Sequence, residues 1–160
     1  MPGEKGEKII TSQAMIFIIV FPILCLDQLS KFIISGRLLL NESIPVIKGV
    51  LYFTLVHNRG AAFGLLKNQL PLFVFTAIVT VVLIYSNLKK HRLGGFSIYN
   101  VSLCLILAGA LGNFIDRIIF GYVIDFLDFR VWPVFNLADS AITAGAVLLG
   151  YTLLFDKRKT

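Results

Sequence analysis

Two aspartates near the carboxyl end of the chain, Asp125 and Asp139, lie in strongly apolar surroundings, VIDFL and NLADSAI. An ionisable group is costly in such an environment, so each carboxyl group is a candidate for function. The chain between them is long enough for a hairpin-like return that brings the two groups together. Two carboxyl groups at close range share a proton and titrate as a pair. Such a pair suits acid–base catalysis: one member takes a proton from water while the other protonates a carbonyl or a leaving group.

Asn136 helps to distinguish the two aspartates, because it is placed to cap a helix that starts after it. Asp139 then lies near the third helical position, where the positive end of the helix dipole favours an ionised carboxylate. The hypothesis is that Asp139 is the charged partner and Asp125 the protonated one. From spacing alone, a helix-start acid at 139 and a loop acid at 125 without a shared role fit equally well.

Two further polar groups interrupt apolar runs. Asp27 and Lys31 are four residues apart, acid first, which is the favourable order for an ion pair on one helix face. The pair is either structural or orients the outer loops. Asn113, Asp116 and Arg117 have i, i+3 and i+4 spacing and form one polar patch. The patch either braces the aspartate pair or caps a helix end.

The segment HNRG at 57–60 predicts a polar turn before an apolar patch. An asparagine at such a place can bind a peptide backbone, because its amide donates and accepts at once. This applies to Asn58, with Gly60 in the turn. Asp128 falls on the opposite face from Asp125 if 122–129 is extended, and we expect it to be solvated.

The elements that must position these residues are membrane spans. The chain of 160 residues is 57% hydrophobic and 15% charged, against roughly 25% charged in a soluble domain. About 20 apolar residues cross a bilayer. This length predicts one domain with four spans, over 14–34, 70–87, 96–115 and 136–155. The outer loops are 35–69, where VLYFTLVHN favours a strand in a small β-structure on the membrane surface, and 116–135, which also has strand-like character.

The basic residues predict the orientation. Lys and Arg cluster in both tails and in the turn between the second and third spans, at positions 5, 8, 89, 90, 92, 157, 158 and 159. The side that carries them is cytoplasmic, so both termini are cytoplasmic and the aspartates lie at the outer face. The same placement favours membrane anchoring over nucleic-acid binding, despite the net charge of +6. With only two histidines and no HExxH motif, a zinc hydrolase is not expected.

Together these motifs resemble the bacterial lipoprotein signal peptidases, also called signal peptidase II. DQLSK at 27–31 resembles the family's DQ-x-T-K, and HNRGAAFG at 57–64 resembles N-x-G-A-A-F. GNFIDR at 112–117 matches G-N-x-x-D-R, and GYVIDF at 121–126 resembles G-x-V-V-D-F. WPVFNLADS at 132–140 resembles F-P-x-F-N-x-A-D-S. The departures, Ser30 for Thr, Ile124 for Val and Trp132 for Phe, are conservative.

The resemblance implies an aspartic endopeptidase of the bacterial cytoplasmic membrane, with Asp125 and Asp139 at the two catalytic positions. The other characteristic positions are Asp27, Lys31, Asn58, Gly60, Asn113, Asp116, Arg117, Asn136 and Ala138. The implied substrate is a prolipoprotein that carries diacylglycerol on its lipobox cysteine and is cut just before that cysteine. No metal or organic cofactor is implied. We expect a monomer whose partners are these substrates and membrane lipid.

Three interpretations compete with this one or extend it. A proton-relay transporter would use Asp27, Lys31 and Asp116, but it needs acids near the bilayer midplane. A non-catalytic assembly subunit would tolerate Asp139→Asn. A presenilin-like protease needs a G-x-G-D segment, and the sequence has none. Within the peptidase interpretation, FGLL at 63–66 is expected to lie against lipid or substrate, and the 35–69 loop is expected to close over the site.

Overall fold

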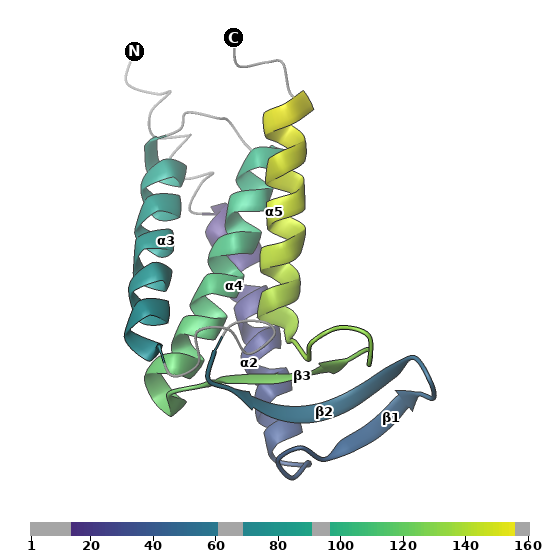
Figure 1. Ribbon diagram of the computed structural model, residues 1–160. Helices are drawn as coiled ribbons and strands as arrows, with labels where there is room; N and C mark the ends of the chain where they lie inside the picture. Colours follow the sequence, from purple (N-terminus) through teal and green to yellow (C-terminus); the bar gives the residue numbers. More distant parts are fainter. Residues whose placement is uncertain (1–13, 61–68, 91–96, 156–160) are drawn as a thin grey trace, which may run out of the picture.

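Four long helices and one small sheet make up the computed structural model, which describes residues 14–60, 69–90 and 97–155 (Figure 1). The first span consists of the π-helix η1 (Ile16–Val20) followed by α2 (Phe21–Ser35). The other helices are α3 (Leu70–Lys90), α4 (Ile98–Phe120) and α5 (Leu137–Phe155). All four spans are long and apolar enough to cross a membrane. The predicted fold class, a four-helix membrane protein with a small β-structure, is confirmed.

The third span differs from its predicted bounds, because α4 continues to Phe120 instead of ending at 115. The apolar residues after Arg117 carry the helix on until Gly121, which ends it in the left-handed region at φ 76°. Its N–H donates to the Arg117 carbonyl, a common glycine cap. Asp116 and Arg117 therefore lie in the last turns of a helix and not in the loop that was expected to begin at 116.

The sheet has three antiparallel strands in the order β1 (Ser43–Ile47), β2 (Leu51–Asn58) and β3 (Val123–Asp128). The strand predicted from VLYFTLVHN is thus β2, and the strand-like part of the second loop is β3. In the β2–β3 register, Val56 pairs with Asp125 and His57 pairs with Ile124. This pairing brings the end of one outer loop beside the other.

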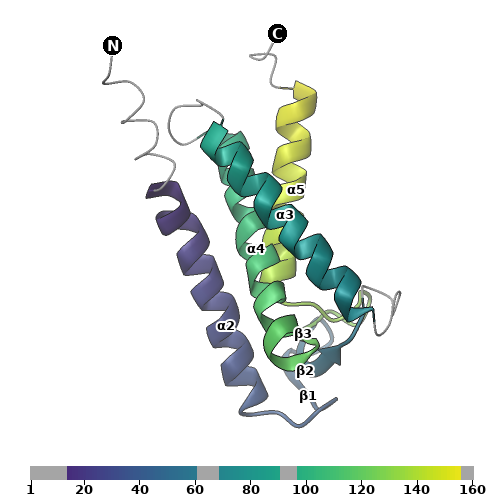
Figure 2. The same cartoon turned by 90° about the vertical axis from the view of Figure 1, so that its left-hand side faces the viewer.

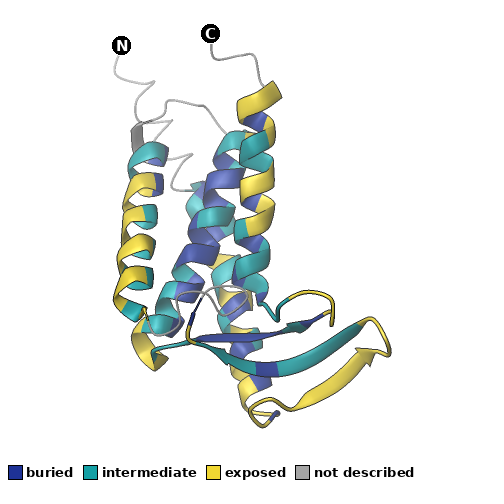
Figure 3. Ribbon diagram, viewed as in Figure 1, coloured by how far each residue is buried: buried dark blue, intermediate teal, exposed yellow. Residues whose placement is uncertain are grey.

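Helix α4 lies at the centre of the bundle and is the most buried of the helices (Figure 3). It packs closely on α5 because small residues face each other there. A Cβ atom added at Gly109 would lie 2.2 Å from the Ala138 carbonyl oxygen. One added at Gly145 would lie 2.7 Å from the Ser102 carbonyl oxygen. Small residues that allow close backbone approach are typical of helix contacts in membranes.

The sheet lies at one end of the bundle, opposite the start of η1 and the end of α5 (Figures 1 and 2). The carboxyl ends of α2 and α4 and the amino end of α5 all reach this end. The two outer loops therefore share one face of the molecule, as the four-span topology predicts. Large apolar side chains point outward from the spans, for example Phe17 at 72% and Leu154 at 77% exposed.

Candidate active site

Two asparagines link the two aspartates. Asp125 lies on β3 and is buried, whereas Asp139 lies half-buried in the first turn of α5. The Asn136 amide Nδ2 donates to Asp125 Oδ1 at 2.7 Å, and Asn113 Nδ2 donates to Asp139 Oδ1 at 2.7 Å. Asn136 Nδ2 also lies 3.1 Å from Asn113 Oδ1, so the two amides touch. One continuous polar chain therefore joins the carboxyl groups of a strand and a helix.

Asn136 also caps α5, as the sequence predicts. Its Oδ1 accepts the Asp139 backbone N–H at 2.8 Å. Asp139 thus occupies the third helical position, near the positive end of the helix dipole. The same side chain holds Asp125 with its amide nitrogen and the start of α5 with its amide oxygen, so it fixes one aspartate relative to the helix that carries the other.

Both carboxyl oxygens of Asp125 accept amide hydrogens. Asn136 donates to Oδ1, and Asn58 Nδ2 donates to Oδ2 at 2.9 Å. Burial, and then the nearby carboxylate of Asp139, raise the pKa of Asp125, while the two amides and the Lys31 ammonium lower it, and the net pKa is about 7. Asp125 therefore changes its protonation state near neutral pH, which is the property that an acid–base group needs.

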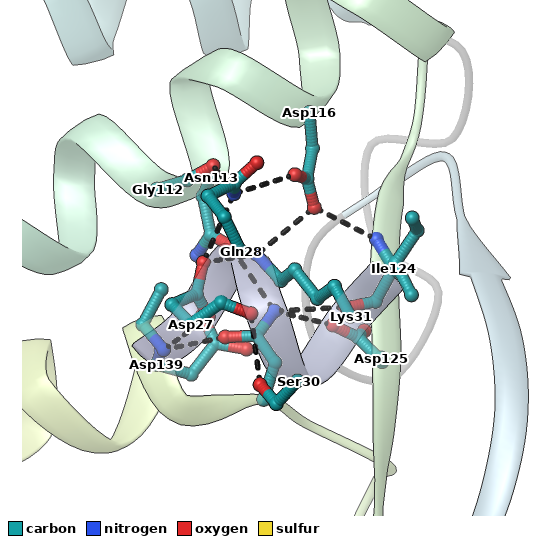
Figure 4. A network of polar contacts seen from close by, with 12 residues as sticks. Asp27, Gln28, Ser30, Lys31, Gly112, Asn113, Asp116, Ile124, Asp125 and Asp139 are labelled. Atoms are coloured by element: carbon teal, nitrogen blue, oxygen red, sulfur yellow. Dashed lines mark hydrogen bonds and ion pairs between the residues drawn. The ribbon is translucent and has the colours of Figure 1, made fainter. Parts of the chain in front are cut away.

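A buried cation lies behind the pair (Figure 4). Lys31 Nζ lies 2.7 Å from Asp27 Oδ2 and 2.9 Å from Asp116 Oδ2, and all three side chains are almost fully buried. The Asp27–Lys31 pair was predicted from its spacing; Asp116 makes it a cluster of three. Lys31 also donates to Asn113 Oδ1 at 3.3 Å. The cation thus touches the same amide that holds Asp139.

The two acids of this cluster hold the two elements that carry the aspartate pair. Asp27 Oδ1 accepts the Ala138 backbone N–H at 2.9 Å, at the start of α5. Asp116 Oδ2 accepts the Ile124 backbone N–H at 3.1 Å, on β3 directly before Asp125. Because each acid also contacts Lys31, the cluster fixes α2, α4, β3 and α5 relative to one another.

Gln28 belongs to this network, although sequence analysis did not single it out. Its Nε2 lies 3.0 Å from Asp116 Oδ1, 3.1 Å from Asp27 Oδ2 and 3.2 Å from the Gly112 carbonyl oxygen. The sequence carried two signals for it: a polar residue beside Asp27 within an apolar helix, and the second position of the DQLSK motif. Gly112 leaves room for these contacts, since a Cβ atom there would lie 2.6 Å from Asp27 Oδ2.

Arg117 and Gly60 lie at the margin of the site. The Arg117 guanidinium lies over the Phe73 ring, 4.7 Å from its centroid, and its Nη1 donates to the Asn113 carbonyl oxygen at 3.4 Å. It therefore faces α3 and donates to no side chain of the network among the described residues, although it interacts electrostatically with Asp139, Asp125 and Asp116. Gly60 is buried, and its N–H donates to Asn58 Oδ1 at 2.9 Å, which fixes the amide that holds Asp125.

Asp128 corrects one prediction, because it is buried and not solvated. It accepts the Thr54 hydroxyl at 2.7 Å and the Arg130 backbone N–H at 2.8 Å. The chain after β3 folds back, and Phe135 pairs with Leu127, so this end of the strand is covered. Asp128 still makes none of the contacts of the aspartate network. The FGLL segment at 63–66, expected to contact lipid or substrate, lies outside the described residues.

Comparisons with known proteins agree with one another. A family model described as signal peptidase (SPase) II matches residues 19–155. A lipoprotein signal peptidase of Halothermothrix orenii is 47% identical over 135 residues, covering 84% of this chain and 92% of the relative. A lipoprotein signal peptidase of Caldanaerobacter subterraneus subsp. tengcongensis is 48% identical over 143 residues, covering 88% of this chain and 97% of the relative.

Two solved structures of bacterial membrane enzymes have a similar fold. One bacterial membrane enzyme superposes with a TM-score of 0.83 at 31% identity, covering 92% of this chain and 93% of its own. Another superposes with a TM-score of 0.81 at 33% identity, covering 90% and 95%. The family match spans the whole polar network, from Asp27 to Asp139.

Proposed function

This chain belongs to the signal peptidase II family, and we propose that Asp125 and Asp139 are the catalytic pair with which it removes signal peptides from prolipoproteins. It is a peptidase and a multi-pass protein of a bacterial membrane. The observation that carries the assignment of the pair is the amide chain between the two carboxyl groups. An arrangement that holds one carboxyl on a strand and another at a helix start suits shared acid–base work.

The proposed reaction begins with Asp125 protonated and Asp139 ionised. Asp139 takes a proton from water as the water oxygen attacks the scissile carbonyl carbon, and Asp125 gives its proton to the carbonyl oxygen. Asp139 then passes its proton to the leaving nitrogen as the carbon–nitrogen bond breaks. The proton on the former carbonyl oxygen returns to Asp125. Both carboxyl groups thus end as they began, and no metal or cofactor enters the balance.

The other residues of the site support this pair. Asn113 and Asn136 orient the two carboxyl groups, and Asp27, Lys31, Asp116 and Ala138 hold the elements that carry them. Asn58 has a second amide hydrogen besides the one that reaches Asp125, and we propose that it donates to a substrate carbonyl. The Arg117 guanidinium lies near the pair and is able to bind a second substrate carbonyl.

The substrate that we propose carries diacylglycerol on the cysteine that follows the scissile bond. Its acyl chains stay in the outer leaflet, so they hold the bond at the depth of the aspartates and contribute binding energy away from the reacting atoms. This placement requires both termini in the cytoplasm, in accord with the basic residues in the tails. The chain is proposed to act as a monomer, because residues of one chain supply every contact of the network.

Mass spectrometry of the cleavage products tests this function. Purified protein is incubated with a diacylated prolipoprotein peptide, or with the same peptide lacking the lipid. The expected products from the lipidated peptide are a free signal peptide and a fragment that begins with the diacylated cysteine. Cleavage at another bond, or equal cleavage of the peptide without lipid, would contradict the proposal.

A further inference from the structure

A groove of about 670 Å³ lies on the side of the sheet away from the aspartate pair. Its walls come from the end of α2, the end of α4, the residues that follow each helix, and strands β2 and β3. Among them are Phe32, Leu40, Phe120 and Tyr122. Phe32 is 77% exposed and Phe120 is 47% exposed, so two aromatic rings flank the mouth. Both helices are long and apolar enough to cross a membrane, and we place the mouth, at the ends of these helices, near the bilayer surface.

The groove and the aspartate pair face opposite sides of β2 and β3. Side chains alternate along a strand. Ile124 and its partner His57 line the groove. The next residues, Asp125 and Asn58, bond each other on the other face. A molecule in the groove would therefore contact the back of the catalytic strand without reaching the scissile bond.

The deep end of the groove is polar in composition but has no unmet hydrogen bonds. Lys31 and Asp116 are among its lining residues, each is at most 1% exposed, and the two are paired with each other. Among the described residues, no buried side-chain nitrogen or oxygen lacks a partner. An apolar chain can therefore enter the groove without desolvating an unpaired charged group. At the rim, Ser35 and the stacked rings of His57 and Tyr122, 3.9 Å apart, offer a more polar edge.

We propose that this groove binds one acyl chain of a membrane phospholipid, with the glycerol end of the lipid at Ser35. The acyl chain leaves one apolar environment for another, so the gain comes from the apolar walls of the groove, which the chain removes from contact with water. Phospholipid surrounds the spans at a far higher concentration than any substrate, so mass action favours it. The substrate's own acyl chains belong on the other face, where the scissile bond must lie.

Photolabelling tests the proposal. The full-length protein is placed in phosphatidylglycerol vesicles that contain a trace of the same lipid with a diazirine on one acyl chain. After irradiation, labelled residues are identified by mass spectrometry. Leu55 and Ile124 line the groove and are only 4% and 6% exposed, so surrounding lipid cannot reach them otherwise. We expect label on both of these residues, besides label on Leu153, which is 70% exposed.

Two variants and a second probe sharpen the result. Ser35→Trp fills the mouth and is expected to abolish label on Leu55 and Ile124 while label on Leu153 persists. The matched control is Ile33→Trp, on the same helix but outside the groove. It is expected to keep the label on all three of these residues. Label confined to exposed residues in the unaltered protein would overturn the proposal. So would stronger groove labelling by a diacylated substrate peptide that carries the diazirine on its acyl chain.

Discussion

At the residue scale, the protonation of Asp125 is set by the side chains around it. Burial and the Asp139 carboxylate favour the neutral form, and Asn58, Asn136 and Lys31 favour the charged form. The net result is a pKa of about 7. In the proposed reaction Asp125 must start protonated. The rate of cleavage should therefore fall as the pH rises past about 7. The two carboxyl groups titrate as a pair, so this fall reports the loss of the proton that they share.

Replacement of Asn58 tests this balance. Asn58→Ala removes an N–H that stabilises the charged carboxylate, so the pKa of Asp125 rises. The alkaline limb of kcat/KM should then move to higher pH. Asn87→Ala is the matched control, because that amide bonds Tyr99 on the helices instead. An alkaline limb that moves to lower pH in Asn58→Ala would contradict the proposed acid.

The buried cation gives a second prediction at this scale. Lys31→Met leaves Asp27 and Asp116 without their common partner, and breaking a buried ion pair costs about 3–5 kcal/mol. Thermal unfolding in detergent should show a large loss of stability. Arg37→Met serves as the control, because that side chain is exposed just after α2, and surface substitutions usually change stability by about 0.5 kcal/mol or less. Similar losses in both variants would refute the structural role of Lys31.

At the scale of elements, the close contact of α4 and α5 sets the position of Asp139. Gly109→Ala places a Cβ atom 2.2 Å from the Ala138 carbonyl oxygen, so the start of α5 must move away. We expect a loss of about 1–3 kcal/mol in stability and a clear drop in cleavage rate.

Gly150→Ala in α5 is the comparison, because among the described residues no atom beyond its chain neighbours and the nearby backbone of α5 lies within 4 Å of the added Cβ. It should retain full activity and be slightly more stable, since alanine favours a helix over glycine. Equal activity in the Gly109 and Gly150 variants, measured with the same lipidated peptide, would show that this contact does not position Asp139.

Local spacing predicted some contacts of the site, and tertiary packing decided the others. The Asp27–Lys31 pair and the Asn136 cap follow from helical spacing, because their partners lie within one turn. The contacts of Gln28 and Lys31 with α4 depend on how two helices meet, which one sequence does not specify. Asp128 shows the same limit. Strand alternation separated it from Asp125, but only the fold of the following loop determines that it is buried.

At the scale of the whole molecule, the four-span topology was predictable because apolar length is a strong signal. The residue at which α4 ends was harder to predict, because apolar residues lie on both sides of Arg117 and give no signal for the end of the helix. The prediction of which side of the membrane the sheet faces depends on the basic residues of the two tails and of the turn between the second and third spans.

Chemical labelling tests that orientation. In a background with Cys25→Ala and Cys104→Ala, Ser43→Cys on exposed β1 should react with a membrane-impermeant maleimide in intact spheroplasts. Thr160→Cys should react only after lysis, because the positive-inside rule places the basic tail in the cytoplasm. The reverse pattern would place the aspartates on the cytoplasmic side and exclude the proposed topology.

The most direct test of the catalytic pair is the rate at which purified Asp125→Asn and Asp139→Asn cleave a diacylated prolipoprotein peptide. Asp128→Asn is the matched control, because Asp128 is also a buried aspartate, on the same strand as Asp125, but lies outside the network. We predict that each of the first two variants loses about a hundred- to ten-thousand-fold in rate, while the control stays near the unaltered protein. Near-normal cleavage by either Asp125→Asn or Asp139→Asn would contradict the assignment.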